Sequence, residues 1–525
     1  MKTLMKMNAR DNVAVALRPL AAGERLQAEG DGAERTVVSS AGMDRTDTGM
    51  TDMNSSDTKL AGIEALQDVP QGHKIATAAI PQGGVVMKYG APIGYATADI
   101  PAGEWVHLHN VRTTLAGEED YVYAPELHPA VYPPRGLTFD GYRRRNGKVG
   151  IRNDLFLVPT VGCVNGIAEL IIAEFKQRHP DLGPFDNVTV LKHPYGCSQL
   201  GDDHRMTRDI LLDAVQHPNA GGVLVFGLGC ENNIVAEFRE KLGDFDESRV
   251  KFLVAQDVGD EVEAGMQLLE ELHAAALGDA REPVPLSELN VGLKCGGSDG
   301  FSGITANPLL GAFSDFLIGQ GGSTILTEVP EMFGAEKVLM ARAQNEEVFS
   351  DIVWLINDFK QYFLSHGESV YENPSPGNKA GGISTLEDKS LGCTQKAGTS
   401  AVVDVLKYGE KLRRKGLSLL QAPGNDLVAS SALAAADCQL VLFTTGRGTP
   451  FGSFVPTVKI ATNNELFAKK GHWMDFNAGP LLERPMEDVL ESFIAYLIEV
   501  ASGRPTRNEQ NQVRELAIFK TGVTL

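Results

Sequence analysis

From residue 150 to the C-terminus, short apolar runs alternate with longer amphipathic segments. Residues 155–158, 188–191 and 223–226 are apolar runs rich in β-branched and aromatic residues, whereas 167–178 and 260–277 repeat their apolar residues at helical spacing. A buried parallel strand is apolar on both faces, and a helix that crosses back over the sheet is apolar on one face only. This alternation therefore predicts an α/β architecture with mostly parallel sheets.

The same pattern continues further along the chain. Additional strand candidates lie at 252–254, 291–293, 323–327, 401–405 and 440–444. A polar segment rich in proline, at 116–140, precedes the first of these α/β blocks and is expected to be a linker. We therefore expect a second domain at 141–284 and a C-terminal domain at 285–525, both of the α/β class.

Residues 1–115 are predicted to form a β domain of short strands joined by turns. Residues 13–17 are an apolar run, and an Ile-Pro-Xaa-Gly turn recurs at 80–83 and 100–103. This pattern resembles the small β-clip module called SAF, which occurs in sugar-acid enzymes. Residues 34–58 are rich in Ser, Thr, Asp, Gly and Met without periodicity, and we expect them to be a disordered insertion.

Composition and charge narrow the choice of partners. The formal net charge of the chain is −20, which repels nucleic acid and anionic lipid, so neither is an expected partner. The N-terminus lacks the apolar region of a signal peptide, and no stretch reaches the roughly 18 uncharged apolar residues of a membrane span. We expect a cytoplasmic protein whose six cysteines are thiols rather than disulfides.

Five of the six cysteines stand beside a glycine, and four of them follow a predicted strand: Cys163, Cys197, Cys230 and Cys295. The carboxyl ends of parallel strands meet at one edge of a sheet, where ligands bind. Thiolates gathered there can hold an iron–sulfur cluster or a single metal ion. The alternative is that each cysteine is a small buried side chain at a tight turn. Cys197 and Cys230 are our candidates for metal ligands.

The densest group of polar side chains lies at 193–204, on a loop expected after a strand. His193, Asp203 and His204 belong to it, and imidazole and carboxylate groups serve both as metal ligands and as general bases. Asp202 has the simpler interpretation of a helix N-cap. We hypothesise that His193 or His204 binds the metal or acts as the base.

Three further stretches, 295–300, 373–382 and 444–450, combine glycine with polar residues. Arg447 stands in a glycine turn after a predicted strand, where its guanidinium can bind a carboxylate bidentately. Glu328 and Glu331 end another strand and add two acids at the same edge. The remaining candidates for substrate binding are Ser298, Asp299, Asn378 and Lys379.

Several motifs together resemble the altronate/galactarate dehydratase family. They are YRRRNGKVGIRN at 142–153, PTVGCVNG at 159–166, HPYGCSQLGDDH at 193–204, GLGCEN at 227–232, CGGSDGFSGITANP at 295–308, TEVPEMFGAE at 327–336, NPSPGNKAGG at 373–382 and TTGRGTP at 444–450. The resemblance implies an enzyme of hexuronate catabolism that converts D-altronate to 2-dehydro-3-deoxy-D-gluconate and water. It also implies a requirement for Fe²⁺ or Mn²⁺.

Such a dehydration needs a base for the α-proton and a metal that stabilises the developing charge. The expected catalytic residues are His193, His204 and Asp203; the expected metal ligands are Cys197, Cys230, His193 and His73; His107 and His109 are further candidates on one face of a strand. Three alternatives stay open: another sugar acid such as galactarate, a dehydratase built on a [4Fe–4S] cluster, and a sugar-acid binding protein without turnover. A homodimer is also expected.

Overall fold

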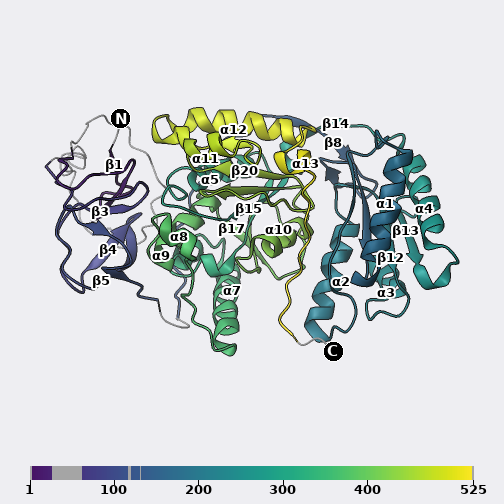
Figure 1. Cartoon of the computed structure of the whole chain (residues 1–525), viewed down its shortest axis with the longest axis horizontal. Coiled ribbons are helices and arrows are strands. Elements are labelled where there is room, and N and C mark those ends of the chain that lie inside the picture. Colours follow the sequence, from purple (N-terminus) through teal and green to yellow (C-terminus); the bar gives the residue numbers. More distant parts are fainter. Residues whose placement is uncertain (1–2, 27–61, 116–119, 130–131, 523–525) are drawn as a thin grey trace.

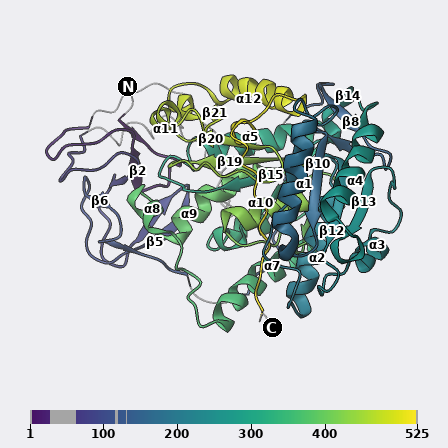
Figure 2. The same cartoon turned by 45° about the vertical axis from the view of Figure 1, so that its right-hand side comes forward.

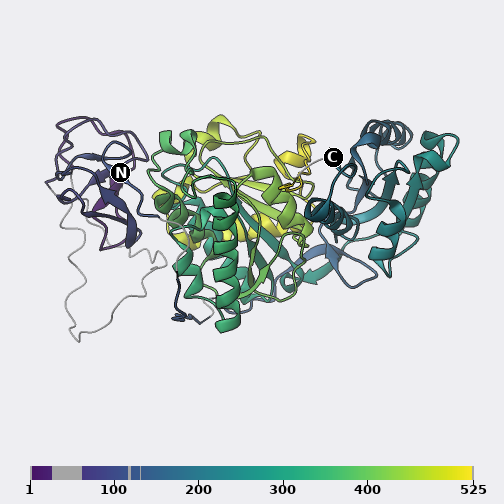
Figure 3. The same ribbon diagram turned by 90° about the horizontal axis from the view of Figure 1, so that it is seen from below.

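The computed structural model describes residues 3–26, 62–115, 120–129 and 132–522, so the expected insertion at 34–58 lies outside the described residues. Three domains lie in a row, with the C-terminal domain in the middle, the N-terminal domain on one side and the second domain on the other (Figure 1 and Figure 3). Within the described ranges, no helix is both long enough and apolar enough to cross a membrane.

The N-terminal domain is built from short antiparallel strands in two sheets, with the orders β1-β2-β3-β6 and β4-β5-β7. The strands are β1 (Leu4–Met5), β2 (Val13–Ala16), β3 (Lys74–Ala76), β4 (Val85–Lys88), β5 (Ala91–Ala96), β6 (Trp105–Val106) and β7 (Val111–Arg112). The two Ile-Pro-Xaa-Gly turns lie side by side, because the backbone amides and carbonyls of Ile80 and Ile100 pair at 2.8 Å in both directions. The expected β domain is confirmed.

The proline-rich segment that follows lies against the C-terminal domain. The Tyr121 hydroxyl donates to Glu336 Oε1 at 2.7 Å, and the Tyr123 hydroxyl donates to the Ala343 carbonyl at 3.2 Å. Both rings also pack on the apolar core of that domain. This stretch of the expected linker is therefore anchored by specific contacts.

The second domain is inserted between strands of one small sheet. Strand β8 (Thr138–Arg143) pairs antiparallel with β9 (Val149–Gly150) and with β14 (Glu282–Pro285), so the chain enters and leaves the domain at the same place. Its own sheet is parallel, with the order β11-β10-β12-β13. Its elements are β10 (Asp154–Pro159), α1 (Asn165–Arg178), β11 (Asn187–Val190), α2 (Gly201–Val215), β12 (Ala220–Gly227), α3 (Val235–Leu242), β13 (Val250–Val254) and α4 (Glu261–Ala276).

The C-terminal domain has a seven-stranded parallel sheet with the order β17-β18-β16-β15-β19-β20-β21. Its strands are β15 (Asn290–Cys295), β16 (Ser323–Leu326), β17 (Val402–Leu406), β18 (Leu417–Leu420), β19 (Leu440–Thr445), β20 (Thr457–Ala461) and β21 (Phe476–Asn477). Its helices are α5 (Ala306–Gly319), α6 (Glu336–Met340), α7 (Glu346–Ser365), α8 (Pro376–Ala380), α9 (Leu386–Cys393), α10 (Asp426–Ala435), α11 (Asn464–Lys469), α12 (Met486–Ala501) and α13 (Arg507–Gln510). The predicted α/β architecture with mostly parallel sheets is confirmed.

An apolar cluster joins the second domain to the C-terminal domain. Phe156 and Val158 of β10 pack in one core with Leu420, Val441 and Phe454, and the rings of Phe156 and Phe454 meet edge-on at 6.1 Å. Helix α2 lies beside α10, in the part of the molecule that Figure 2 brings forward. Because shared apolar burial resists separation, this interface holds the two domains in a fixed arrangement.

Candidate active site

The sheet of the C-terminal domain has a topological switch point between β15 and β19. The chain leaves β15 toward β16 on one side, whereas β19 begins the strands on the other side. The loops after these two strands are joined, because Gly296 donates to the Thr444 carbonyl at 3.0 Å and Gly446 donates to the Gly297 carbonyl at 3.1 Å. In open α/β sheets such a crevice at the carboxyl ends of the strands is where ligands bind.

Charged side chains are buried directly behind this crevice. The Lys294 ammonium donates to Glu328 and, at 2.9 Å, to Asp426 Oδ1. The Lys396 ammonium donates to Glu328 Oε2 at 3.0 Å and to Cys295 Sγ at 2.8 Å. Burial disfavours the charge on Lys294, but the two carboxylates outweigh it and raise the pKa of this lysine. The group is thus an ionic network whose members are held in place by one another.

Two thiols and a carboxylate meet at the centre of this network. Cys295 Sγ and Cys393 Sγ are 3.4 Å apart, and both contact Glu331 Oε2, at 3.3 and 3.2 Å. Lys389 pairs with the other oxygen of Glu331 at 2.8 Å. The contact with Cys295, together with burial, raises the pKa of the Cys393 thiol. Burial disfavours ionisation of Glu331, yet Lys389, Lys294 and Lys396 lower its pKa to about 2.

This trio fits a divalent metal ion. The ligand atoms of Cys295, Glu331 and Cys393 all lie within 4.8 Å of one another and are buried. Thiolate and carboxylate together suit iron better than calcium or magnesium. A divalent ion bound by both thiolates replaces two thiol protons, so the net charge of the buried network is unchanged. Binding of a divalent ion by the two thiolates therefore leaves no uncompensated charge in the buried network.

The N-terminal domain closes over the same edge through buried ion pairs. Asp388 of α9 accepts from the ammonium groups of Lys74 at 2.8 Å and Lys88 at 2.9 Å, and all three side chains are almost fully buried. Lys74 also donates to the Gly382 carbonyl at 2.7 Å. Although burial disfavours its charge, the two lysines hold the pKa of Asp388 well below its usual range. The domains are thus joined by charges that neutralise each other.

Two histidines of the N-terminal domain complete this contact. His107 Nδ1 lies 3.1 Å from the Ser384 hydroxyl, and His73 Nε2 lies 3.3 Å from the Ala380 carbonyl. Burial lowers the pKa of both rings, and with the nearby Lys74 ammonium it brings that of His107 to about 3. Both imidazoles are therefore neutral at physiological pH.

A small cavity lies between the two domains. Its lining includes Lys88 from the N-terminal side and Ser298, Asp299, Lys389 and Cys393 from the C-terminal side. Asp299 accepts from Thr462 Oγ1 and Ser302 Oγ, both at 3.0 Å, while burial raises its pKa. The buried Ser298 hydroxyl has no hydrogen-bond partner among the described residues. The cavity therefore combines cations, a carboxylate of raised pKa and an uncommitted hydroxyl.

The other substrate-binding candidates surround this cavity. The Asn378 amide donates to the Ser298 carbonyl at 2.9 Å, and its oxygen accepts from Lys389 at 3.2 Å. Lys379 is half-buried on α8. Arg447 is exposed, and its backbone amide donates to the Gly297 carbonyl at 3.1 Å. The glycine-rich stretches singled out in the sequence thus lie together at one edge of the C-terminal domain.

The segment at 193–204 lies elsewhere, in the second domain on the far side of the C-terminal domain (Figure 1). Both ring nitrogens of His193 are engaged by backbone: Nε2 with the Pro159 carbonyl at 2.8 Å, and Nδ1 with the Tyr195 amide at 3.2 Å. Asp203 accepts from the amides of Thr521 and Gly522, each at 2.8 Å. His204 Nε2 is buried and has no partner among the described residues.

These contacts separate residues that were expected at a single site. His193 and Asp203 hydrogen-bond to the backbone of a loop and of the C-terminal segment, and the metal-binding and proton-transfer roles predicted for them stay predictions. Cys197 and Cys230 are exposed in this same domain, whereas His73 faces the C-terminal domain.

The sequence did carry a signal for the residues that were not predicted. Lys294 lies within a strand that is otherwise apolar and buried, and lysine is almost never fully buried unless it is paired. The same argument applies to Lys74 and Lys88 in short strands of the N-terminal domain. Buried lysines in strands are thus a better guide to this site than the density of polar residues.

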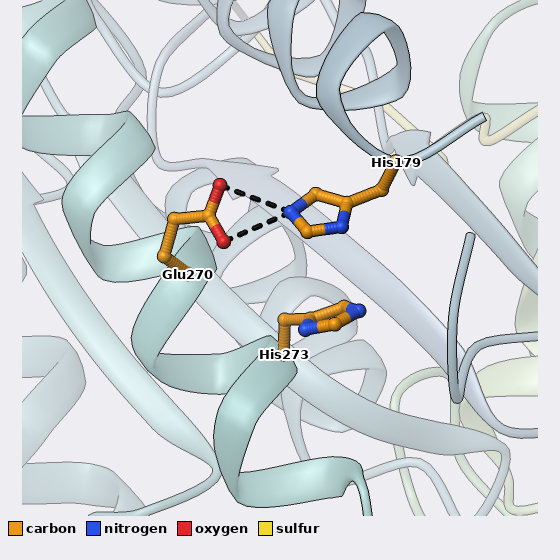
Figure 4. A group of neighbouring side chains, drawn as sticks. All are labelled: His179, Glu270 and His273. Carbon is orange, nitrogen blue, oxygen red and sulfur yellow. Dashed lines mark hydrogen bonds and ion pairs between the residues drawn. The ribbon is translucent and has the colours of Figure 1, made fainter. Parts of the chain in front are cut away.

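A second group of candidate ligands lies on the second domain, where His179 follows α1 and both Glu270 and His273 belong to α4 (Figure 4). His179 Nε2 contacts the two oxygens of Glu270 at 3.0 and 2.9 Å. The ring centroids of His179 and His273 are 4.2 Å apart, and the rings are tilted by 30° to each other. The contact between His179 and Glu270 connects the end of α1 to α4.

Fold and site together define an α/β enzyme whose buried cavity is closed by a small β domain. The chain belongs to the D-galactarate/altronate dehydratase family: family models for its SAF domain, second domain and C-terminal domain match residues 2–114, 141–277 and 286–524. The N-terminal domain is thus the SAF module that the repeated turns resembled. Membership makes the chain a hydro-lyase.

Three curated relatives place the chain within this family. It is 60% identical to an altronate dehydratase of Bacillus subtilis over the whole of both chains. It is 55% identical to an altronate dehydratase of Escherichia coli over 99% of each chain. It is 35% identical to a galactarate dehydratase (L-threo-forming) of Escherichia coli over 84% of this chain and 88% of that one. The family resemblance identified from the sequence motifs is confirmed.

Proposed function

We propose that this chain dehydrates D-altronate to 2-dehydro-3-deoxy-D-gluconate in the cavity between its N-terminal and C-terminal domains. The observation that carries the proposal is full-length identity of 60% and 55% with two altronate dehydratases, against 35% with a galactarate dehydratase. The cavity supports it with cations for a carboxylate and a carboxyl group of raised pKa. Galactarate is the competing substrate.

The chemistry requires removal of the proton next to the substrate carboxylate and loss of the neighbouring hydroxyl. A bound Fe²⁺ or Mn²⁺ ion supplies Lewis acidity toward the substrate oxygens, and Cys295, Glu331 and Cys393 are the residues that would hold it. The Lys88 and Lys389 ammonium groups line the cavity and offset the negative charge that develops on the substrate.

We assign the proton transfer to Asp299. Its carboxylate lines the cavity and is oriented by Thr462, Ser302, Asn463 and the backbone of Phe301. Burial raises its pKa, which makes the carboxylate a stronger base than an exposed one. The neighbouring Ser298 hydroxyl has no competing partner among the described residues and is placed to hydrogen-bond a substrate hydroxyl.

Enzyme assays with matched variants test this function. The purified protein, supplied with Fe²⁺ or Mn²⁺, should form a 2-keto acid from D-altronate and much less from galactarate. Asp299→Asn should lower kcat by about 10²–10⁴ with unchanged metal content, the usual effect of removing a general base. The control is Asp315→Asn, which changes a buried carboxylate that accepts from Thr399 and Ser400 outside the cavity.

Three outcomes would contradict the proposal. Equal rates with D-altronate and galactarate would contradict the assignment of D-altronate as the substrate. Binding of altronate without any keto acid would favour a sugar-acid binding protein. Full activity after exhaustive chelation, with no metal detected by elemental analysis, would contradict the proposed requirement for a metal ion.

The cellular setting is part of the same proposal. All six cysteines are unpaired thiols, the state favoured in the reducing cytoplasm, where we place the enzyme. The partner is a small sugar acid rather than nucleic acid or membrane, as the net charge of −20 favours. A homodimer is expected, and analytical ultracentrifugation of the purified chain tests it.

A further inference from the structure

Three of the six cysteines are exposed, and all three lie in the second domain. Cys163, Cys197 and Cys230 are exposed, whereas the other three cysteines are buried. Free cysteine is among the most buried residue types and an exposed thiol is open to oxidation, so three exposed thiols in one domain are unusual. The proposed reaction in the interdomain cavity uses none of them.

The three thiols are gathered at one edge of the sheet. Cys163 follows β10, Cys197 follows β11 and Cys230 follows β12, and these strands are neighbours in the order β11-β10-β12. The strands are parallel, so their carboxyl ends meet at the same edge. Residues that are 67 positions apart in sequence, Cys163 and Cys230, thus stand on adjacent loops.

Hydrogen bonds fasten the three loops to one another. Gly162 donates to the Tyr195 carbonyl at 2.8 Å, which ties the first loop to the second. Ser198 donates to Asn232 Oδ1 at 2.8 Å, which ties the second to the third. The Asn233 amide donates to the Thr160 carbonyl at 2.9 Å, which ties the third to the first. Each of these bonds involves a residue within three positions of an exposed cysteine.

The close approach of the loops explains one glycine beside a thiol. Gly196 has a φ of +97°, and a Cβ at this position would lie 2.0 Å from the Thr160 carbonyl oxygen. Any other residue would force the second loop away from the first. The backbone that carries Cys197 is therefore shaped to bring this thiol to the loop of Cys163.

In this structure the three thiols do not form a compact group of ligands for a single ion. Two sulfurs on one zinc ion are at most about 4.6 Å apart, because each Zn–S bond is about 2.3 Å. The three exposed thiols are not among the groups whose ligand atoms all lie within 4.8 Å of one another, unlike Cys295, Glu331 and Cys393. In an iron–sulfur cluster each thiolate binds a different iron atom, so the sulfurs stand further apart.

The surroundings favour negative charge. Helices α1, α2 and α3 begin at Asn165, Gly201 and Val235, each shortly after one of the three cysteines, so their positive ends face this edge. Gln256 Nε2 donates to Cys230 Sγ at 3.6 Å. The neighbouring buried acid, Glu231, is held in place as a carboxylate, because Thr160 and the backbone amides of Leu228 and Gly229 all donate to it. Thiolates are stabilised in such a setting.

We propose that Cys163, Cys197 and Cys230 bind a [4Fe–4S] cluster in the second domain. Three protein thiolates would ligate three of the four irons, and the fourth iron would have no cysteine ligand. Assembly replaces the three thiol protons by iron–sulfur bonds; two Fe²⁺, two Fe³⁺ and four sulfide ions supplied from outside give the oxidised cluster without a change of oxidation state. The site is separate from the interdomain cavity, since the second domain lies on the opposite side of the C-terminal domain (Figure 1).

Anaerobic reconstitution of the full chain with equal amounts of Fe²⁺ and Fe³⁺, sulfide and a thiol reductant tests this site. After desalting, about four iron and four sulfide ions per chain should remain, with a brown colour and an electron paramagnetic resonance signal after reduction. Cys163→Ser, Cys197→Ser and Cys230→Ser should each lose the sulfide and the colour. Circular dichroism on the same samples checks that the variants are folded.

Two control variants keep the test specific. Cys438→Ser removes a buried thiol of the apolar core, and Cys393→Ser removes a thiol that lines the interdomain cavity. Both should retain the full cluster. Bound iron without sulfide, a cluster that survives in all three test variants, or a cluster lost in Cys393→Ser would each overturn the proposal.

Discussion

Both large sheets of this molecule are parallel, and the loops at their carboxyl edges carry different kinds of side chain. In the C-terminal domain the edge is covered by the N-terminal domain, and it carries the buried charges of Lys294, Glu328 and Lys396. In the second domain the edge is open, and it carries exposed thiols, among them Cys197 and Cys230. Topology places functional loops at such an edge. Whether the edge is covered by another domain then decides whether its side chains are buried or exposed.

Burial explains the difference in physical terms. A charge that is removed from water must be paired, so the covered edge is a network in which every member depends on another. Exposed groups have no such requirement, and their replacement disturbs the fold little. Substitutions at the covered edge should therefore have large and coupled effects, and those toward solvent should have small and separate ones.

The largest effect is expected from Glu331→Gln. The change removes a proposed metal ligand and leaves Lys389 buried without its partner carboxylate. The rate of altronate dehydration should fall by about 10²–10⁴, and metal content should fall with it. Steady-state kinetics and elemental analysis on the same preparation measure both quantities.

Glu336→Gln is the matched control, because Glu336 is also buried and paired with a lysine, but its partners are Lys360 and Tyr121 rather than the two thiols. This variant should keep its metal and its rate. If both variants lose activity equally, the effect of Glu331→Gln reflects stability rather than chemistry.

The next largest effect is expected from Asp388→Ala at the junction of the N-terminal and C-terminal domains. This substitution leaves the ammonium groups of Lys74 and Lys88 buried without a counter-charge. It should lower the free energy of unfolding by about 3–5 kcal/mol, the usual result of breaking a buried pair. Denaturant unfolding followed by fluorescence measures it.

An exposed pair supplies the comparison. Glu491→Ala breaks the contact with Arg135, in which both side chains are largely exposed. Its cost should be at most about 1 kcal/mol. Equal losses for Asp388→Ala and Glu491→Ala would contradict the view that burial distinguishes the junction.

The fold could largely be predicted from the sequence because hydrophobic periodicity is a local signal. The run at 223–226 lies inside β12, Ala220–Gly227, and the run at 440–444 lies inside β19, Leu440–Thr445. The glycine-rich stretches after β15 and β19 were also expected at the edge where they are found. Strand order and the covering of that edge depend on domain docking, which has no short-range pattern.

The candidate site was harder to predict for the same reason. Lys88 and Asp388 are 300 positions apart, and only the docked domains bring them together. The segment at 193–204 is dense in polar groups because its loop needs them: His193 satisfies backbone groups on two sides, and Asp203 holds the C-terminal segment. The dense polar residues at 193–204 therefore anchor a loop of the second domain and do not lie at the cavity between the N-terminal and C-terminal domains.

A smaller, pH-dependent effect on the free energy of unfolding is expected at the interface between the second and C-terminal domains. His217 is buried there, with Nε2 against the Cys438 carbonyl at 3.2 Å and Nδ1 accepting from the Asn219 amide at 3.1 Å. Burial lowers the pKa of His217 to about 4 from an ordinary value of 6.5. Between these values the unfolded chain binds a proton that the folded chain does not, so stability falls as the pH is lowered.

The loss between pH 6.5 and 4 should approach about 3 kcal/mol, since one pKa unit corresponds to 1.36 kcal/mol. Buried carboxyl groups such as Asp213, whose pKa burial raises to about 7, titrate in the same range. The measurement is therefore the difference between wild type and His217→Gln in urea unfolding at each pH. A difference that does not change with pH would show that His217 is not the responsible group.

The smallest effect is expected at the exposed rim of the covered edge, from Arg447→Lys. Arg447 stands on the loop after β19, joined through its backbone amide to the Gly297 carbonyl of the loop after β15. Its side chain is exposed, unlike the buried lysines behind it. If the guanidinium binds the substrate carboxylate with two parallel hydrogen bonds, lysine keeps the charge but loses one of them, at a cost of about 1.5 kcal/mol. KM for altronate should rise about tenfold while kcat and the free energy of unfolding stay unchanged. Wild-type KM would show that this arginine is only solvated, and a fall in kcat instead would place it among the groups that act in the transition state.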